Sequence, residues 1–577
     1  MASHQQLDAS GRPSIRHSLI GYLAGVLLLF SVPACSAESR SDTPDVGRIE
    51  QLFEQQRWQE IVADFAHAGE SADINFYYGT ALARLERWPE ATAAFAAGLR
   101  IAPHDPRFPI ELAGVAFKQK KYAEAEGWLR RALRLSPQDA YANDFLGTVF
   151  FLEGNLEAAL KYWNRVGKPH IDSVSPDPLP RLNPVLLDRS FVFSPASTLH
   201  LNDLLATEAR LNYLDVFPIF HFELPARDDG NFDLVFHNLE RHGCGSNKWE
   251  CLLLILGGTP ARTLSFDYFN VHGDAINFKS LFRWDPEKRR LMAGIETPLF
   301  RTPKWHLSAG VDLRNENWAL RNSFSGPAPL LGALNLKREA VQLQFADVMS
   351  GRWHWSTATE FSDRSYHNVL AGNLLTPQLL TGGSQLKQSF GIGAELLRLP
   401  ERRLTIGSKA TADVARLWSG GGGNFAQLRG ALQLHWFSQH TGDRYEIQHT
   451  VSAGKTFGDP SFDELFMLGV LGDSELPMRA HIATRDGKKG SAPLGQNYFL
   501  SNWEGTRNVS PISFLKIKVG PFVDTGRISD PNSGLGSQKW LWDVGAQAKL
   551  QIFGFGVTLA YGRDLRSGRN AVTAEAQ

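Results

Sequence analysis

The second half of the chain alternates between apolar and polar residues over long stretches. Residues 305–314 carry Trp, Leu, Ala, Val and Leu at every second position, with His, Ser, Gly, Asp and Arg between them. Residues 429–437, 445–453 and 540–551 alternate in the same way. A period of two sends successive side chains to opposite faces of a β-strand. The pattern therefore predicts antiparallel strands with one apolar and one polar face.

Two architectures are compatible with this alternation. In a transmembrane β-barrel the apolar face meets lipid and the polar face surrounds a lumen, whereas a large soluble β-sandwich is the alternative that the period alone does not exclude. Roughly 325 residues follow residue 252. At about 20 residues per strand and connection, that length gives about 16 strands of ~9–11 residues. We expect an outer-membrane β-barrel over residues 246–577.

An earlier region repeats with a period of 34 residues. Three columns of the repeat are Gly79, Ala113 and Gly147; Ala91, Ala125 and Ala159; and Phe95, Leu129 and Trp163. Small residues let two helices approach closely, and the larger residues fill the gap between neighbouring helix pairs. The pattern resembles the tetratricopeptide repeat. That resemblance implies an α-solenoid over residues 45–170 whose concave surface binds peptides or proteins.

A smaller α+β unit is expected between these two regions. Residues 167–183 are rich in Pro, Asp and Ser and are predicted to form a linker. A helix over 199–214 and strands over 218–224 and 232–239, joined by a turn at 227–230, follow from the periodicity. Residues 211–240 resemble the POTRA module, the periplasmic domain of outer-membrane assembly factors. We therefore expect a linker and a POTRA-like module over 171–245.

The N-terminus has the layout of a secretory signal peptide. Residues 18–34 are apolar and follow Arg12, Arg16 and His17. The apolar run is shorter than the ~20 residues that span a bilayer, and an N-terminal membrane anchor is the alternative. We expect a signal peptide over residues 1–37. Cys35 is a candidate for lipidation, although Val32 and Pro33 depart from the lipoprotein pattern.

Cysteine usage agrees with export. Apart from Cys35 the chain contains only Cys244 and Cys251, with six residues between them. In an oxidising compartment these two thiols are candidates for a disulfide that closes a small loop. Two Cys without an organised pair of His make only half of a zinc site, so no metal site is expected.

Charge and motifs argue against nucleic-acid binding and catalysis. Lys plus Arg and Asp plus Glu both number 60, so the chain has no bias towards nucleic acid. Residues 454–456 read Gly-Lys-Thr, but His449 stands where a phosphate-binding loop requires its first Gly. The chain lacks a Gly-x-Ser-x-Gly elbow and a His-Glu-x-x-His motif. We expect a protein that is not an enzyme and holds no cofactor.

Short motifs at both ends of the alternating region resemble one family of barrels. They lie at residues 269–273, 296–300, 468–481, 502–507, 522–526, 540–546 and 561–566. In sequence and order they resemble the BamA/TamA-type outer-membrane assembly-factor superfamily, also called bacterial surface antigens. The resemblance implies that the loop containing residues 468–481 folds back into the barrel.

The same resemblance assigns roles to single residues. The loop's Arg479 is expected to pair with Asp524, with Phe522, Glu504, Arg507 and Gly526 as supporting residues of the neighbouring strands. An Arg fork on a carboxylate forms two parallel charge-assisted hydrogen bonds, which suit a latch in a partly dewatered lumen. Ala480 and His481 stand where the family has Gly and an aromatic residue. The alternative is that Arg479 and Asp524 are ordinary surface charges.

The resemblance implies an outer-membrane assembly or translocation factor with its N-terminal domains in the periplasm. Its repeats would bind protein clients or partner subunits, and its barrel would contact outer-membrane lipid. The alternative is a passive outer-membrane pore for polysaccharide export, since repeat arrays joined to barrels also serve that purpose. A surface-anchored structural protein without a transport role is a third reading.

Overall fold

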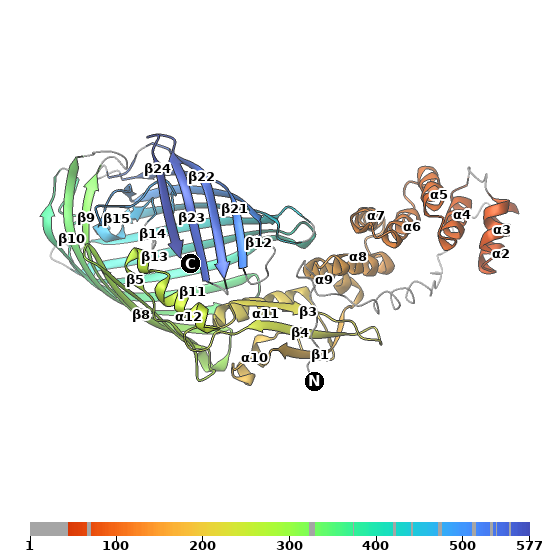
Figure 1. Cartoon of the computed structure of the whole chain (residues 1–577), viewed down its shortest axis with the longest axis horizontal. Helices are drawn as coiled ribbons and strands as arrows, with labels where there is room; N and C mark the ends of the chain where they lie inside the picture. The colour runs from red at the N-terminus through yellow and green to blue at the C-terminus, as the bar shows by residue number, and fades with distance from the viewer. Residues whose placement is uncertain are drawn as a thin grey trace.

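A computed structural model describes residues 44–65, 71–321, 329–372, 374–418, 423–439, 442–470, 476–510, 515–530, 535–537, 539–552 and 555–576. It contains a helical arm, a small mixed sheet and a large barrel, in that order along the chain (Figure 1). The predicted signal peptide (1–37) and the lipidation candidate Cys35 lie outside the described residues.

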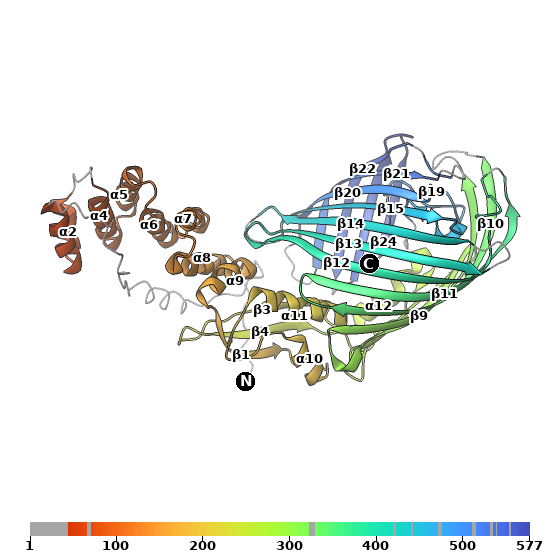
Figure 2. The same cartoon turned by 180° about the vertical axis from the view of Figure 1, so that it is seen from behind.

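The arm is a row of antiparallel helices that extends away from the barrel (Figures 1 and 2). Its helices are α2 (Pro44–Glu54), α3 (Trp58–Asp64), α4 (Ala72–Arg84), α5 (Trp88–Ile101), α6 (Arg107–Lys118), α7 (Tyr122–Leu135), α8 (Ala140–Leu152) and α9 (Leu156–Trp163). In the 34-residue repeat, small residues on one helix of a pair contact large residues on the other helix. A Cβ atom on Gly79 would lie 2.7 Å from the Phe95 ring, and one on Gly147 would collide with Trp163. Glycine at these positions therefore sets how closely each helix pair packs.

The middle unit is a four-stranded sheet with two helices. Its strands are β1 (His170–Asp177), β2 (Ser197–Thr198), β3 (Ile219–Glu223) and β4 (Phe232–Leu239), in the order β2-β1-β4-β3. Helices α10 (Pro184–Ser190) and α11 (Leu201–Leu214) pack on it. The predicted helix, turn and hairpin are present, and β3 is the end strand of the sheet.

One expectation for this unit is wrong. Residues 167–183 were expected to form a linker, but β1 lies within them and pairs in parallel with β4. Ile171 is fully buried, and Val174 packs against the same core. The partner of β1 lies some 60 residues further along the chain. A local composition rich in Pro, Asp and Ser carries no sign of such a distant partner.

The C-terminal part is a closed barrel of antiparallel strands. Its strands of seven or more residues are β7 (Ile276–Asp285), β8 (Lys288–Pro298), β9 (Trp305–Arg321), β10 (Leu330–Val348), β11 (Trp353–Leu370), β12 (Gly383–Leu399), β13 (Leu404–Trp418), β14 (Asn424–Phe437), β15 (Tyr445–Gly458), β20 (Asn497–Asn508), β21 (Leu515–Ser529), β22 (Leu541–Ile552), β23 (Phe555–Asp564) and β24 (Asn570–Ala576). Short strands β5 (Thr263–Leu264) and β6 (Tyr268–Val271) border β7. The alternating segments of the sequence therefore became barrel strands, in a number close to the expected 16.

The start of this region differs from the expectation. Strands were expected from about residue 252, but Lys248–Leu256 form a helix, α12, and the first barrel strand begins at Thr263. The run Leu252–Leu256 is apolar at every position and does not alternate. A short apolar run of this kind does not distinguish a strand from a helix by its period.

The two faces of the barrel differ in polarity. Apolar side chains that stay exposed on the strands include Phe282, Leu291, Val341, Leu343, Phe361, Phe390, Ile392, Val414, Leu428, Leu432, Phe457, Trp503, Trp542 and Tyr561. Buried polar side chains of the same strands include Glu316, Arg338, Arg364, Gln385, Asp413, Gln427, Asp524 and Asp543. An apolar exterior around a charged interior is the reverse of a soluble protein. Among the described residues, no helix has the length and apolar composition needed to cross a bilayer.

The middle unit and the arm dock on one end of the barrel. We call this end the near rim and define it by the turns at residues 299–304, 349–352 and 400–403 and by residues 438–439 and 442–444. The Asn183 amide donates to the Gly273 carbonyl at 2.7 Å, and the Asn277 side chain donates to the Leu214 carbonyl at 2.8 Å. A Cβ atom on Gly351 would lie 2.5 Å from the backbone of Leu205. The middle unit is therefore in direct contact with the barrel.

Candidate functional site

A long loop between β15 and β20 crosses the interior of the barrel. Within residues 459–496 it contains a 3-10 turn (Phe462–Glu464) and the short strands β16 (Phe466–Met467), β17 (Thr484–Arg485), β18 (Lys488–Lys489) and β19 (Leu494–Gly495). Its described side chains pair with β9, β11 and β21, which lie in different parts of the barrel wall. The described part of the loop therefore lies in the lumen. We call it the lumen loop.

The tip of the lumen loop meets the wall through Arg479. Its Nε and Nη2 atoms donate to the two carboxylate oxygens of Asp524 at 2.9 and 2.5 Å, and its backbone amide donates to the same group at 3.0 Å. Nη1 donates to Glu504 at 2.6 Å and to Gln547 at 2.8 Å. The guanidinium carbon lies 3.9 Å from the centre of the Phe522 ring. This arrangement holds the guanidinium from three sides.

Most of the predicted supporting residues contribute to this contact. Glu504 and Phe522 touch Arg479 directly, and Gly526 leaves space for the loop, because a Cβ atom there would lie 2.8 Å from Met478 Sδ. Arg507 does not join them. It is exposed, and its guanidinium carbon lies 5.8 Å from the Tyr445 ring centre. The sequence therefore identified the anchor but placed Arg507 in it without structural support.

The sequence reasoning missed a second contact at the tip. The Ala480 amide donates to Asp543 Oδ2 at 2.8 Å, and His481 Nδ1 lies 3.0 Å from the same oxygen. His481 Nε2 lies 3.9 Å from Asp564 Oδ2. The signal was His481 itself, a titratable residue at a position where the motif that the loop resembles has an aromatic ring.

These three side chains also form a candidate metal-ligand group. The ligand atoms of His481, Asp543 and Asp564 all lie within 4.8 Å of one another. However, hydrogen bonds already join the imidazole to Asp543, and the Ser567 amide and hydroxyl donate to Asp564. These hydrogen bonds hold the three side chains in place without an ion.

The base of the lumen loop has its own anchor. Asp463 lies 3.0 Å from Arg364 and 3.2 Å from Arg338, and Glu464 lies 3.1 Å from Lys387. The Arg364 side chain is fully buried. A third anchor, Lys489 to Glu316 at 2.7 Å, connects the returning part of the loop to β9. No local motif marks these pairs in the sequence, because their members lie on strands far apart along the chain.

The predicted disulfide is present beside α12. Cys244 and Cys251 are bonded, with their Cα atoms 5.1 Å apart. Glu250 is buried beside them and accepts a hydrogen bond from Arg241 Nε at 2.8 Å. A Cβ atom on Gly257 would collide with the Phe555 ring, so the end of α12 packs tightly against β23. The disulfide therefore fixes the passage from the sheet into the barrel.

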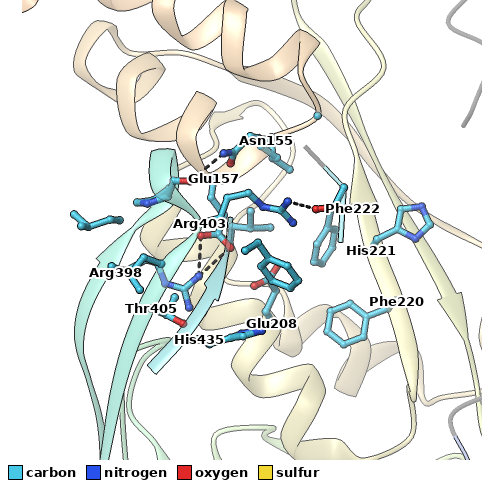
Figure 3. Close-up of a pocket in the computed structure, with 18 residues that line it drawn as sticks. Asn155, Glu157, Glu208, Phe220, His221, Phe222, Arg398, Arg403, Thr405 and His435 are labelled. Carbon is cyan, nitrogen blue, oxygen red and sulfur yellow. Dashed lines mark hydrogen bonds and ion pairs between the residues drawn. The ribbon is translucent and has the colours of Figure 1, made fainter. Parts of the chain in front are cut away.

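A second candidate site lies at the near rim, where all three parts of the chain meet (Figure 3). A cavity of about 470 Å³ is lined by the α8–α9 turn, by α11, by β3, by the barrel turn at 400–403, by the end of β14 and by Gly442. We call it the junction pocket. Figure 3 shows Phe220 and Phe222 facing the pocket from β3 and His221 pointing to the other side of the strand.

Polar contacts between the arm and the barrel close one side of the junction pocket. The Asn155 side chain donates to the Pro400 carbonyl at 2.9 Å, and Lys161 Nζ lies 2.6 Å from Glu401. Arg398 Nη1 lies 2.7 Å from Glu157. These contacts join the last helix pair of the arm to the β12–β13 turn.

Glu208 of α11 also lines this pocket. Burial, helped by the nearby negative charge of Glu157, raises the pKa of the Glu208 carboxyl to about 7, although Arg398 opposes the shift. A carboxyl with that pKa is substantially protonated near neutral pH. The pocket therefore carries less negative charge than its residue types suggest.

Fold and site together define the class: a β-barrel protein whose lumen is crossed by one of its own loops and whose near rim carries a sheet unit and a helical-repeat arm. Tetratricopeptide repeat models match residues 82–149 and 55–106, which confirms the repeats expected in the arm. No curated protein matches the chain.

Several solved structures are similar to the chain at low sequence identity. BamA from Haemophilus ducreyi lacking POTRA domains 1–3 is 12% identical over 71% of this chain and 84% of that chain, with a TM-score of 0.39. CdiB from Escherichia coli is 12% identical over 71% and 75%, with a TM-score of 0.45. CdiB from Acinetobacter baumannii is 13% identical over 70% and 72%, with a TM-score of 0.41. At this level of similarity, function does not transfer with the fold.

Proposed function

We propose that this protein is an outer-membrane assembly or translocation factor. In this proposal the barrel spans the outer membrane, the arm and the POTRA-like unit lie in the periplasm, and protein clients pass through or along a barrel that the lumen loop plugs at rest. The apolar exterior and charged interior of the barrel support the membrane location.

The Arg479 anchor is the observation that carries the proposal. A passive pore needs an open lumen, whereas this lumen is crossed by a loop held by a buried charge cluster at its tip. A charge cluster can exchange its partners, so it suits a plug that is fixed at rest and displaced during transport. The driving force would be folding and burial of the client itself, since the outer membrane has no nucleotide supply.

Client binding would begin at the near rim. The concave side of the repeat array is a surface on which such arrays bind peptides. Strand β3 ends its sheet, and an edge strand offers unpaired backbone groups to an extended client segment. Strand β3 lies next to the near rim, whereas the arm extends outward from it, so a segment captured on the arm would be passed along the arm to the rim.

The runner-up remains a passive pore for polysaccharide export. In-cell photo-crosslinking from position 221 on β3 discriminates between the two functions. Crosslinks to unfolded barrel or secreted proteins support the proposal, and crosslinks to glycan-synthesis partners support the pore. Recovery in outer-membrane fractions and altered gel migration when unheated test the membrane barrel itself; a soluble protein with unchanged migration would contradict both functions.

The proposal also predicts the effect of removing the anchor. Arg479→Ala should change client handling or pore conductance while the barrel still migrates as a folded species. If both assays are unchanged, the lumen loop is not a functional plug.

A further inference from the structure

The junction pocket contains an arginine without a carboxylate partner. Arg403 donates to the backbone carbonyls of Gln439, at 3.4 Å, and Gly442. Its guanidinium carbon lies 4.4 Å from the centre of the Phe437 ring. Among the described residues, no carboxylate oxygen lies within 4 Å of this guanidinium. Neutral groups therefore make its direct contacts, while Asp443 and Glu157 act on its charge from beyond that distance.

The neighbouring cation of the pocket is already paired. Arg398 lies 2.7 Å from Glu157 and 2.5 Å from Glu395. Arg403 is thus the cation in this pocket that can accept a new anionic partner. Figure 3 shows its side chain extending from the barrel turn into the space in front of β3.

The opposite wall of the pocket is β3, the end strand of its sheet. In the described sheet β3 pairs with β4 on one side, so the backbone groups on its other side have no strand partner. Such an edge accepts an extended peptide through main-chain hydrogen bonds. Phe220 and Phe222 face the same space and provide apolar contact for alternate side chains of the peptide.

We propose that the junction pocket binds an extended peptide segment whose carboxylate is held by Arg403 while its backbone pairs with β3. The inference rests on the proposed function and names the chemical feature of a client that this site selects. An arginine fork binds a carboxylate by two parallel hydrogen bonds, which gives selectivity that an apolar groove lacks.

The remaining acid in the pocket is compatible with this occupant. Glu208 is held largely neutral near pH 7 by burial, so it does not cancel the charge of Arg403. Glu157 is engaged by Arg398. Among the described residues that line the pocket, Arg403 is therefore the cation left for an incoming carboxylate, with Asp443 nearby as a competing charge.

The test uses the full chain in detergent micelles and a fluorescent ten-residue peptide of alternating Val and Thr. Three forms of the peptide are compared: a free C-terminal carboxylate, a C-terminal amide, and an amide with one internal Asp. Binding is measured by fluorescence anisotropy. Tighter binding of the first form identifies a chain end as the source of the carboxylate, and tighter binding of the third identifies an acidic side chain.

Arg403→Gln should weaken binding of the carboxylate-bearing peptide by about tenfold or more and leave the amide unchanged. The matched control is Arg402→Gln, on the same turn with an exposed side chain. Hydrogen exchange provides a second readout, because the bound peptide should protect backbone amides of residues 219–223. Equal binding by the wild type and Arg403→Gln, no binding of any form, or binding without protection of β3 overturns the inference.

These outcomes separate the inference from the proposed function. If the protein fractionates with the outer membrane and migrates as a folded barrel, but binds the peptides with and without a carboxylate equally well, only the inference is refuted. A protein that is absent from the outer membrane refutes the proposed function whatever the peptide does.

Discussion

The lumen and the near rim contain the same kinds of charge pair in different surroundings. At the tip of the lumen loop, the side chains of Arg479 and Asp524 are 9% and 0% exposed. At the near rim, those of Lys161 and Glu401 are 31% and 10% exposed. Removing one partner of a buried pair costs about 3–5 kcal/mol, whereas a partly exposed pair contributes about 0–1 kcal/mol.

This difference assigns different mechanical roles to the two regions. The lumen loop is held by buried anchors at its base, its tip and its return, so it stays in one position until something replaces those partners. The arm rests on weaker contacts that water and salt can loosen. Under the proposed function, a fixed lumen loop and an adjustable arm suit a protein that first collects a segment at the rim and then displaces the loop.

The largest effect is expected when Asp524, the buried partner of Arg479, is removed. Asp524→Ala leaves the Arg479 guanidinium buried without its bidentate partner, and we expect the docked loop to lose about 3–5 kcal/mol. Hydrogen exchange across residues 476–496 measures the release. Asp443→Ala, which alters a partly exposed carboxylate near the rim, is the control and should leave exchange in the loop unchanged. If residues 476–496 of Asp524→Ala exchange as slowly as in the wild type, the other anchors hold the lumen loop in place without Asp524.

The disulfide beside α12 should give the next largest effect. Replacing Cys244 and Cys251 by Ser removes a small covalent loop, which is worth about 2 kcal/mol by loop entropy. We expect faster hydrogen exchange over residues 244–256, with the lumen loop unchanged. If hydrogen exchange in the lumen loop becomes faster as well, the disulfide region and the lumen loop are coupled more strongly than their separate contacts suggest.

The pH dependence of the junction provides a smaller effect. Burial raises the Glu208 pKa to about 7, so the native state retains a proton that the unfolded state releases near its ordinary value. The free energy of unfolding should therefore fall as pH rises from about 4.5 through 7. Glu208→Gln should not show this fall. Its free energy of unfolding should exceed that of the wild type by roughly 1–2 kcal/mol at pH 8 and should be similar to it at pH 4.

Urea unfolding followed through exchange of α11 at the two pH values measures that slope. Glu54→Gln, at an exposed position of α2, is the matched control and should behave as wild type at both. A variant at Glu208 that keeps the wild-type slope would show that this carboxyl titrates normally.

The smallest effect is expected at Glu401. Glu401→Gln removes the charge that Lys161 contacts at 2.6 Å but keeps a side chain that can accept from Tyr162. We expect the arm's contact with the rim to weaken by less than about 1 kcal/mol, and by less still at high salt. The distance distribution between spin labels on α9 and on the β12–β13 turn reports this change. Glu124→Gln, on the exposed side of α7, should leave the distribution unchanged.

The sequence predicted the features that depend on local periodicity. Period two identified the long strands, and period 34 identified the helix pairs with Gly79 and Gly147 at their crossing points. The tip anchor was also predictable, because the motifs around Arg479 and Asp524 keep their order along the chain. Cys244 and Cys251 could be paired because export leaves them without other partners.

Features that depend on distant partners escaped prediction. The composition around β1 predicts a linker, because the strand partner of β1, β4, comes some 60 residues later. The base anchor joins Asp463 to Arg364 across 99 residues. The junction pocket combines residues from the arm, the sheet and the barrel, and no local pattern records that these three parts meet. Helix α12 was not predicted for a different reason. Its apolar run does not alternate, so its period does not distinguish a helix from a strand.

Single-channel conductance in planar bilayers tests the plug most directly. Ala480 Cβ lies 3.2 Å from where a Cβ atom of Gly562 would be, so cysteines at these positions are placed to lock the loop tip to β23. We predict that Arg479→Ala conducts more than wild type, that adding Ala480→Cys and Gly562→Cys to it abolishes the increase, and that a reductant restores it. Arg479→Ala alone should not respond to the reductant. Equal conductance in all of these proteins, oxidised or reduced, would contradict the claim that the lumen loop plugs the barrel.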